Sequence, residues 1–293
     1  MEAVGHVKTS SLCSWKKRVT LDPVIPLSSA MEDVNVKVLN FKQWLKDVME
    51  VQKRDPSHGM EHFERVRVSA LQIAAKTNPP SEEESLVLQL AALCHDVLDH
   101  KYMRKIEEGK GDVASEEELK AAMKEALQSL AGLTPQQVED VCLVSDNVSL
   151  SKELAGLLQE DLLMERRLSH LRDYVSDADK LDALGMGGLK RLAQYQARLL
   201  QDSETSVHRL SSAYLRGIAQ RHLLHRVDYL RTEAAAFEGR RLLRETSCIM
   251  ASDAALERII ECVLLEEMKS NASMKAAGTV SVLRLQEDGS FPR

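Results

Sequence analysis

The chain contains no proline between Gln136 and Phe291, and this feature limits its fold more than any other. Leu, Ala, Glu, Lys, Arg and Gln, which are good helix formers, fill much of the sequence, and without proline they favour long helices. Aromatic residues make up only 4% of the chain and there are 13 glycines. Sheet proteins favour aromatic and β-branched residues and need many turns. The sequence therefore predicts an all-α fold, a single helical bundle.

We expect the helical domain to span residues 34–270. Residues 1–33 contain two prolines and several serines and threonines, and residues 1–31 carry four basic against two acidic residues, which indicates a disordered N-terminal tail. Residues 1–31 would also suit an organelle-targeting peptide, and the sequence leaves that alternative open. Residues 271–293 are expected to form a C-terminal tail.

Apolar spacing and helix-terminal residues predict the individual helices. Ser81 with Glu84, and Thr134 with Gln137, have the spacing of capping boxes. Helices are expected at Val34–Lys53, Gly59–Lys76, Glu82–Val97, Ser115–Leu130, Thr134–Asn147, Leu168–Leu184, Gly188–Gln201 and Asp253–Met268. The region Thr205–Cys248 is expected to be helical throughout, interrupted only by Gly217 and Gly239.

Charge and cysteine content exclude several classes of protein. There are 39 Lys and Arg against 45 Asp and Glu, so the net charge is −6, and no stable nucleic-acid partner is expected. The longest apolar stretch, Leu86–Cys94, is about half of the ~20 residues that a membrane span needs, so no membrane association is expected. The five cysteines show no CxxC spacing, which argues against a zinc ribbon. Free thiols are typical of a reducing compartment, and we expect a cytoplasmic protein.

Histidine and aspartate stand where helices should be apolar. His95 and Asp96 follow the apolar run, and His95 lies on the face that should point inward. His62 begins the apolar face of the preceding helix. The short loop between the two helices predicts antiparallel packing, which would bring His62 towards His95. Asp179 interrupts the apolar face of a later helix. A buried carboxylate is costly unless it is paired, hydrogen-bonded or bound to a metal. The pattern therefore indicates a cation site or a polar cavity.

The series His62, His95-Asp96 and Asp179 resembles the H…HD…D signature of the HD-domain metal-dependent phosphohydrolases, an all-helical superfamily. The surrounding residues are most similar to its YedJ/YpgQ-like branch, over roughly residues 40–250. The stretches that carry this resemblance are Asp55–Val66, Ala91–Lys101 and Asp177–Gly185. The chain departs from the family pattern at Val144–Leu150 and at Leu150–Arg167, which is lengthened and charged.

The resemblance implies specific site residues. The metal ligands would be His62, His95, Asp96 and Asp179. Two histidines and two aspartates leave positions open on a six-coordinate ion, which suits Mn, Mg, Co, Ni or Fe. Further residues near the cavity, which would orient water or contact phosphate, are Asp177, Asp99, Lys101 and His58. Asp177 is also the weaker alternative to Asp179 as a ligand.

The function that this resemblance implies is hydrolysis of a nucleotide or another small phosphorylated metabolite, with a metal-activated water attacking phosphorus. Two alternatives remain open: a catalytically idle scaffold that senses a nucleotide or binds a partner, and a di-iron oxygenase with His58 as an extra ligand. The sequence leaves homo-oligomerisation undecided. The arginine-rich region that includes Arg221 and Arg226 is either a solvated face, which we favour, or a wall that attracts anions.

Overall fold

A computed structural model describes residues 29–52, 54–99, 116–159, 165–202, 210–266 and 268–269 of the chain. The expected C-terminal tail and most of the expected N-terminal tail lie outside these residues. The first helix begins at Ser29, five residues before the expected start of the helical domain at residue 34.

All regular structure in the described residues is helical, as predicted, and none of these helices is long and apolar enough to cross a membrane. Most predicted helices are confirmed to within a few residues at each end. The larger elements are α1 (Ser29–Val51), α2 (Met60–Thr77), α3 (Glu82–Cys94), α5 (Glu116–Ser129), α6 (Pro135–Asp146), α9 (Arg166–Asp182), α10 (Gly185–Asp202), α11 (Ser212–His222) and α12 (Glu233–Met250). Residues 253–266 form a further helix.

Three short helical elements join these helices: η2 (Pro56–His58), α7 (Leu150–Leu154) and η3 (Leu224–Tyr229). The element α7 occupies the start of the stretch that departs from the family pattern. Both predicted capping boxes are present. Ser81 and Thr134 accept the N–H groups of Glu84 and Gln137, and the side chains of Glu84 and Gln137 accept the N–H groups of Ser81 and Thr134. Local sequence therefore sets where α3 and α6 begin.

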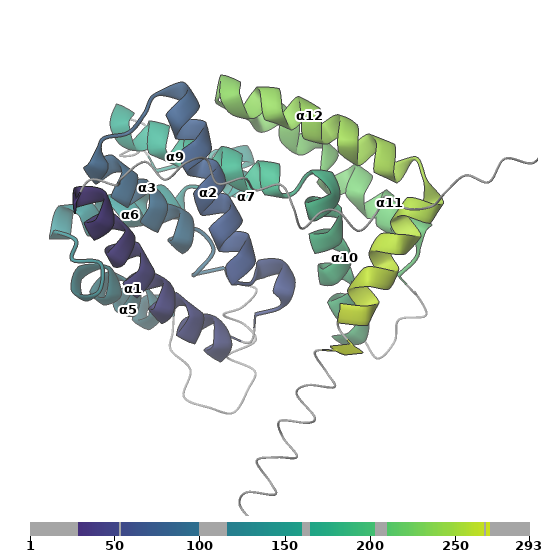
Figure 1. The fold of residues 1–293 in the computed structure, drawn as a ribbon, viewed down its shortest axis with the longest axis horizontal. Helices are drawn as coiled ribbons and strands as arrows, with labels where there is room; N and C mark the ends of the chain where they lie inside the picture. The colour runs from purple at the N-terminus through teal and green to yellow at the C-terminus, as the bar shows by residue number, and fades with distance from the viewer. Residues whose placement is uncertain are drawn as a thin grey trace, which may run out of the picture.

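The helix α3 forms the centre of the bundle. From Leu86 to Cys94 every side chain is buried, because α1, α2, α6 and α9 pack around it. Figure 1 shows α1, α2, α3, α5, α6 and α9 in one group, with α10, α11 and α12 beside them. The helix α2 packs against both α3 and α9, so three helices that carry the predicted ligands are mutual neighbours.

The turn between α9 and α10 depends on glycine. Gly185 has a φ of +68°, a left-handed conformation that favours glycine, and its N–H donates to Thr246 Oγ1 at 2.7 Å. A Cβ atom on Gly188 would lie 2.0 Å from the Ala183 carbonyl oxygen, so this position also excludes larger residues. The tight turn brings α10 back beside the end of α9.

The region Thr205–Cys248 differs from the prediction. Gly217 and Gly239 both lie inside helices, and the chain instead leaves helical geometry at residues 230–232, between η3 and α12. A Cβ atom on Gly239 would lie 2.4 Å from Leu230 Cδ1, so this glycine permits close packing rather than a break. Thr232 caps α12 by accepting the N–H of Ala235.

Candidate metal centre

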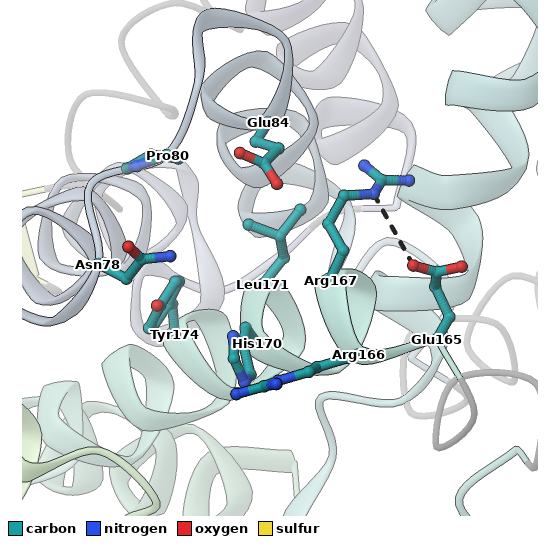
Figure 2. A pocket seen from close by; sticks show the side chains of 9 residues that line it. All are labelled: Asn78, Pro80, Glu84, Glu165, Arg166, Arg167, His170, Leu171 and Tyr174. Carbon is teal, nitrogen blue, oxygen red and sulfur yellow. Dashed lines mark ion pairs between the residues drawn. The ribbon is translucent and has the colours of Figure 1, made fainter.

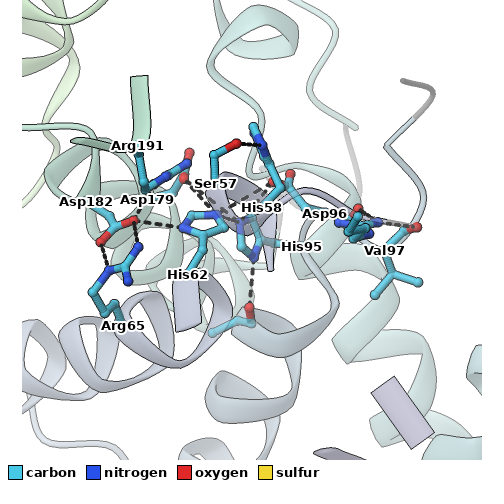
Figure 3. Close-up of polar contacts among 12 residues, drawn as sticks. Ser57, His58, His62, Arg65, His95, Asp96, Val97, Asp179, Asp182 and Arg191 are labelled. Carbon is cyan, nitrogen blue, oxygen red and sulfur yellow. Dashed lines mark hydrogen bonds and ion pairs between the residues drawn. The ribbon is translucent and has the colours of Figure 1, made fainter. Parts of the chain in front are cut away.

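Four of the predicted residues converge from three helices. His62 lies in the first turn of α2, His95 and Asp96 directly follow α3, and Asp179 lies near the end of α9. The two imidazoles are almost completely buried, whereas the side chains of Asp96 and Asp179 are 29% and 21% exposed. Figure 3 shows all four side chains directed toward one another. The centre is thus buried on its histidine side and open on its carboxylate side.

The tautomers of the two histidines follow from their hydrogen bonds. His62 Nδ1 lies 2.8 Å from a carboxylate oxygen of Asp182, and His95 Nδ1 lies 2.8 Å from the Ala92 carbonyl oxygen. Both partners are acceptors, so in each neutral ring the proton sits on Nδ1. The two Nε2 atoms then carry lone pairs, and they face each other at 3.2 Å. Such an arrangement is unfavourable unless a cation lies between them.

Carboxylate oxygens complete this electron-rich cluster. Asp96 Oδ2 lies 3.7 Å from His62 Nε2 and 3.6 Å from His95 Nε2, and Asp179 Oδ1 lies 3.6 and 3.9 Å from the same two atoms. An ion with ligands at about 2.1 Å places neighbouring ligand atoms about 3.0–3.4 Å apart, depending on geometry. The distances in the cluster are close to these values. His62, His95 and Asp96 form a group that could hold a metal ion.

The pKa values of the cluster residues are shifted because the imidazoles and carboxylates lie so close together. Burial opposes a charge on His62, but the carboxylates of Asp182 and Asp96 outweigh it and raise the pKa of the imidazole above its usual 6.5. Burial likewise opposes charge on the two aspartates, but His95 and His62 lower the pKa of Asp96 and of Asp179. The carboxylates therefore remain ionised and favour a positive charge among the imidazoles, whether a proton or a metal cation.

Asp182 is a site residue that the sequence reasoning missed. Its carboxylate accepts from His62 Nδ1, from Arg65 Nε at 2.6 Å and from Arg191 of α10. Burial opposes charge on this carboxyl, but His62, Arg65 and Arg191 lower its pKa. A carboxylate behind a histidine fixes the ring orientation and leaves Nε2 for a metal. The sequence signal that could have indicated this role is that Asp182 is the third aspartate of the Asp177–Gly185 stretch.

The turn that carries His95 and Asp96 is held from behind. Arg54 donates to the carbonyl oxygens of Asp96 and Val97, at 2.6 and 3.0 Å, and its guanidinium lies 5.4 Å from the centre of the Phe63 ring. Gln52 also donates to the Val97 carbonyl. Residues before α2 therefore position the ligands that follow α3.

A pocket of about 300 Å³ adjoins the cluster and is rich in cationic and aromatic groups. Arg226 lines it and reaches Asp179, with Nη1 3.9 Å from Oδ2. Arg221 is exposed, so the two arginines of this region differ: only Arg226 faces the candidate site. The Nε atom of Arg191 is buried without a hydrogen-bond partner among the described residues. The other polar residues of the lining are Ser57, His58, Tyr195, Gln196 and His222.

The additional residues that the resemblance implied lie in different places. His58 belongs to the pocket, and its Nδ1 lies 2.8 Å from Ser57 Oγ. Asp99 is in the turn after α3, where its N–H donates to the Asp96 carbonyl. Lys101 lies outside the described residues. Asp177 is fully buried, and its carboxylate accepts from the backbone of Arg231 and Thr232 rather than facing the cluster.

Comparisons with known proteins show what this helical bundle, with its cluster that could hold a metal ion, is similar to. The family model for the HD domain matches residues 59–184, a segment that contains His62, His95, Asp96 and Asp179. A search of curated proteins found no significant match.

Solved structures share the fold. A Lactobacillus plantarum protein is 17% identical, with 80% of this chain and 97% of that chain covered and a TM-score of 0.51. Bacillus subtilis YpgQ is 18% identical, with 76% and 95% covered and a TM-score of 0.51. An HD-superfamily hydrolase from Bacillus thuringiensis is 20% identical, with 76% and 95% covered and a TM-score of 0.50. These likenesses extend beyond the matched segment to most of the chain.

Proposed function

We propose that this protein is a divalent-metal-dependent phosphohydrolase that acts on a nucleotide or another small phosphorylated metabolite. The observation that carries the proposal is the convergence of two imidazole lone pairs and two carboxylates at 3.2–3.9 Å, beside a pocket that contains arginine. The match of residues 59–184 to the HD-domain family model and the fold shared with an HD-superfamily hydrolase support it.

In this proposal His62, His95, Asp96 and Asp179 hold an ion such as Mn, Mg, Co, Ni or Fe. When bound, the ion would polarise a phosphoryl oxygen and lower the pKa of a water molecule, which attacks phosphorus. Asp182 keeps the His62 proton on Nδ1, so that Nε2 stays available. The partial exposure of Asp96 and Asp179 gives substrate an approach from the pocket side.

The pocket supplies the remaining roles. Arg226 lies beside Asp179, where its guanidinium would bind the phosphate and offset the charge that develops on it. His58 lies on the same wall and would donate to a phosphate oxygen. Asp99 and Lys101 stay predicted contacts of water or phosphate. The three hydrogen bonds of Asp177 support a structural role for this residue instead.

The size and lining of the pocket favour a small substrate. A volume of about 300 Å³ is at the lower end of small-molecule sites. The rings of His58 and Tyr195 lie 5.8 Å apart at 70°, and aromatic side chains of this kind can pack against a nucleobase. These features fit a nucleotide better than a nucleic-acid strand.

The experiment is a metal analysis followed by a substrate screen. The purified chain is assayed with nucleotides and phosphomonoesters in the presence of Mn, Mg, Co or Ni. We expect hydrolysis that EDTA abolishes and that Asp96→Ala removes. Asp253→Ala is a matched control. This carboxylate is exposed, forms an ion pair with Arg216 and does not line the candidate substrate pocket.

Four outcomes would contradict the proposal. A folded protein that hydrolyses nothing with any metal, or equal activity in Asp96→Ala and Asp253→Ala, would exclude the hydrolase. Two irons per chain would point to an oxygenase. Nucleotide binding without turnover would point to a sensing scaffold.

A further inference from the structure

The candidate substrate pocket has two ends of different chemistry. Its walls are one face of α10 and the segment from α11 to η3. Arg226 of η3 lies beside Asp179 of the metal cluster, and Arg191 of α10 pairs with Asp182. Both walls then lead away from the cluster, along α10 to Gln196 and back along α11. One end of the pocket is therefore cationic, and the other end contains an amide.

Gln196 lies at the end of the pocket that is away from the metal cluster. It is polar but buried, with only 8% of it exposed. It follows Arg191 by five residues, about 7–8 Å further along α10 at about 1.5 Å per residue. Tyr214, in the first turn of α11, donates its hydroxyl proton to Gln196 Oε1 at 2.9 Å. This contact joins the two helices at the far end of the pocket and holds the amide there.

The hydrogen bond from Tyr214 determines which atoms of Gln196 are left for a ligand. Because Oε1 accepts the phenol proton, the amide nitrogen Nε2, with its two N–H groups, is free to donate. Gln196 lines the pocket, and Nε2 has no hydrogen-bond partner among the described residues. Buried polar groups normally have a partner in the protein, in water or in a ligand. The far end of the pocket thus presents a donor that is held in one orientation.

A nucleotide matches this arrangement when its phosphate lies at the cationic end of the pocket. Its base then reaches Gln196 with the edge that is farthest from the sugar. On that edge uracil and thymine carry the keto oxygen O4 and guanine carries O6, whereas cytosine and adenine carry an amino group. A keto oxygen accepts from Nε2. An amino group would place two donors against each other and leave one of them unsatisfied.

We propose that Gln196 selects keto bases, so that the pocket prefers a uracil, thymine or guanine nucleotide to a cytosine or adenine nucleotide. This inference rests on the proposed function for the place of the substrate, and it adds which bases the substrate carries. Tyr214 does not line the pocket and acts by fixing the amide, so it is a positioning residue. Leu192 and Ile218, which also line the pocket, supply apolar surface for the faces of the base.

The test compares uridine monophosphate with cytidine monophosphate, which are nearly equal in size and differ at the edge that would face Gln196. Calorimetry with the EDTA-treated full chain measures binding without turnover. We expect the uridine nucleotide to bind about tenfold more tightly, because only its keto oxygen satisfies Nε2.

Two variants separate the donor from its orientation. Gln196→Met removes the donor, so the uridine nucleotide should bind about tenfold more weakly and the cytidine nucleotide within about twofold of its former affinity. Tyr214→Phe lets the amide rotate and present its oxygen to cytosine, so the preference should fall to about twofold. A merely structural role for Tyr214 would weaken both nucleotides equally. Tyr174→Phe is the matched control, because Tyr174 lines a separate pocket between the start of α9 and the turn before α3, shown in Figure 2.

The outcomes distinguish this inference from the hydrolase proposal. Equal binding of the two nucleotides, a preference for the cytidine nucleotide, or binding of neither would overturn the role of Gln196 and leave the hydrolase proposal standing. A preference that changes to the same extent in Tyr214→Phe and Tyr174→Phe would also overturn it. Binding that favours the uridine nucleotide, without hydrolysis in the presence of any metal, would support the role of Gln196 and contradict the hydrolase instead.

Discussion

Asp177 and Asp179 lie two residues apart on α9, and their carboxylates meet opposite kinds of partner. Asp177 accepts three N–H or O–H donors from the Arg231–Thr232 segment at 2.8–2.9 Å. Asp179 faces two imidazole nitrogens at 3.6 and 3.9 Å, and neither presents a proton in its neutral form. Burial with donors stabilises a fold, whereas burial among other acceptors prepares a site for a cation.

The same contrast extends to the neighbours of the two aspartates. On the Asp177 side, Glu153 accepts from Arg172, Lys180 and Arg231, and these pairs join α7, α9 and the segment before α12. On the Asp179 side, Asp182 supports His62. One helix therefore carries a structural hub on one side and the candidate metal centre on the other.

The largest expected effect is on the metal side. Asp179→Asn keeps the shape of the side chain but removes a charge that a cation needs. We expect metal-dependent hydrolysis to fall roughly 1,000-fold, about 4 kcal/mol of transition-state stabilisation. In the metal-free protein the Tm should fall slightly, because His95, His62 and Arg226, which lower the pKa of Asp179, lose a charged partner. Calorimetric metal titration and steady-state kinetics provide the measurement. An Asp179→Asn protein with full activity would show that the ligand set is wrong.

The hub should give the largest effect on stability. Burial opposes charge on Glu153, but Lys180, Arg231 and Arg172 lower its pKa to about 2, from an ordinary 4.5. This carboxylate therefore stabilises the fold above about pH 4.5, and the contribution is lost as the pH falls toward 2. The shift corresponds to at most about 3 kcal/mol.

Urea unfolding of the natural chain and of Glu153→Gln, at several pH values, tests this expectation. The difference in unfolding free energy should be no more than about 3 kcal/mol at pH 6 and should shrink below pH 4. A difference that does not change with pH would mean that lost packing, rather than charge, explains the effect.

Asp182→Asn tests the support of His62. We expect metal affinity to fall 10- to 100-fold, because an amide no longer selects the His62 tautomer so strongly. Arg65 and Arg191 also lose their charged partner, so thermal unfolding should be followed in parallel. A change in Tm without a change in metal affinity would assign Asp182 to the fold alone.

The smallest expected effect comes from Asp177→Asn. The amide of asparagine has one acceptor oxygen, so it can accept fewer of the hydrogen bonds from Arg231 and Thr232 than the carboxylate does. The free energy of unfolding should therefore fall by about 1–2 kcal/mol. For a domain of this size each kcal/mol lowers the Tm by roughly 2–4 °C. Metal affinity should stay within about twofold of the natural chain. A loss of metal binding with an unchanged Tm would instead indicate that Asp177 is a metal ligand.

The helices and the converging cluster could be predicted from sequence because their signals are local. Ser81 and Thr134 mark helix starts through neighbours three residues away, and His95 and Asp179 stand out against apolar periodicity. Asp182 is the last residue of α9, where an acidic side chain is ordinarily solvated. Its role depends on α10 turning back to bring Arg191 beside it. No residue within one helical turn of Asp182 indicates that Arg191 will be its partner.

The break at residues 230–232 could not be predicted for a related reason. Asp177, which accepts the N–H groups of Arg231 and Thr232, is 54 residues from Arg231 in sequence. The Asp177–Asp179 pair is equally ambiguous as a sequence, since both aspartates belong to one short run. Only the packing of that segment against α9 decides which carboxylate receives donors.

The hydrogen bonds that Arg54 and Gln52 donate to the backbone after His95 affect where a fragment with an intact candidate site can begin. The HD family match starts at residue 59, but the carbonyl groups after His95 are bound by side chains that precede it. A fragment that starts at residue 59 would contain every candidate ligand and would still lose the restraint on the Asp96 backbone. Truncation should therefore loosen the metal centre before it unfolds the bundle. A fragment that keeps this restraint must begin at or before residue 52, in the turn that follows α1.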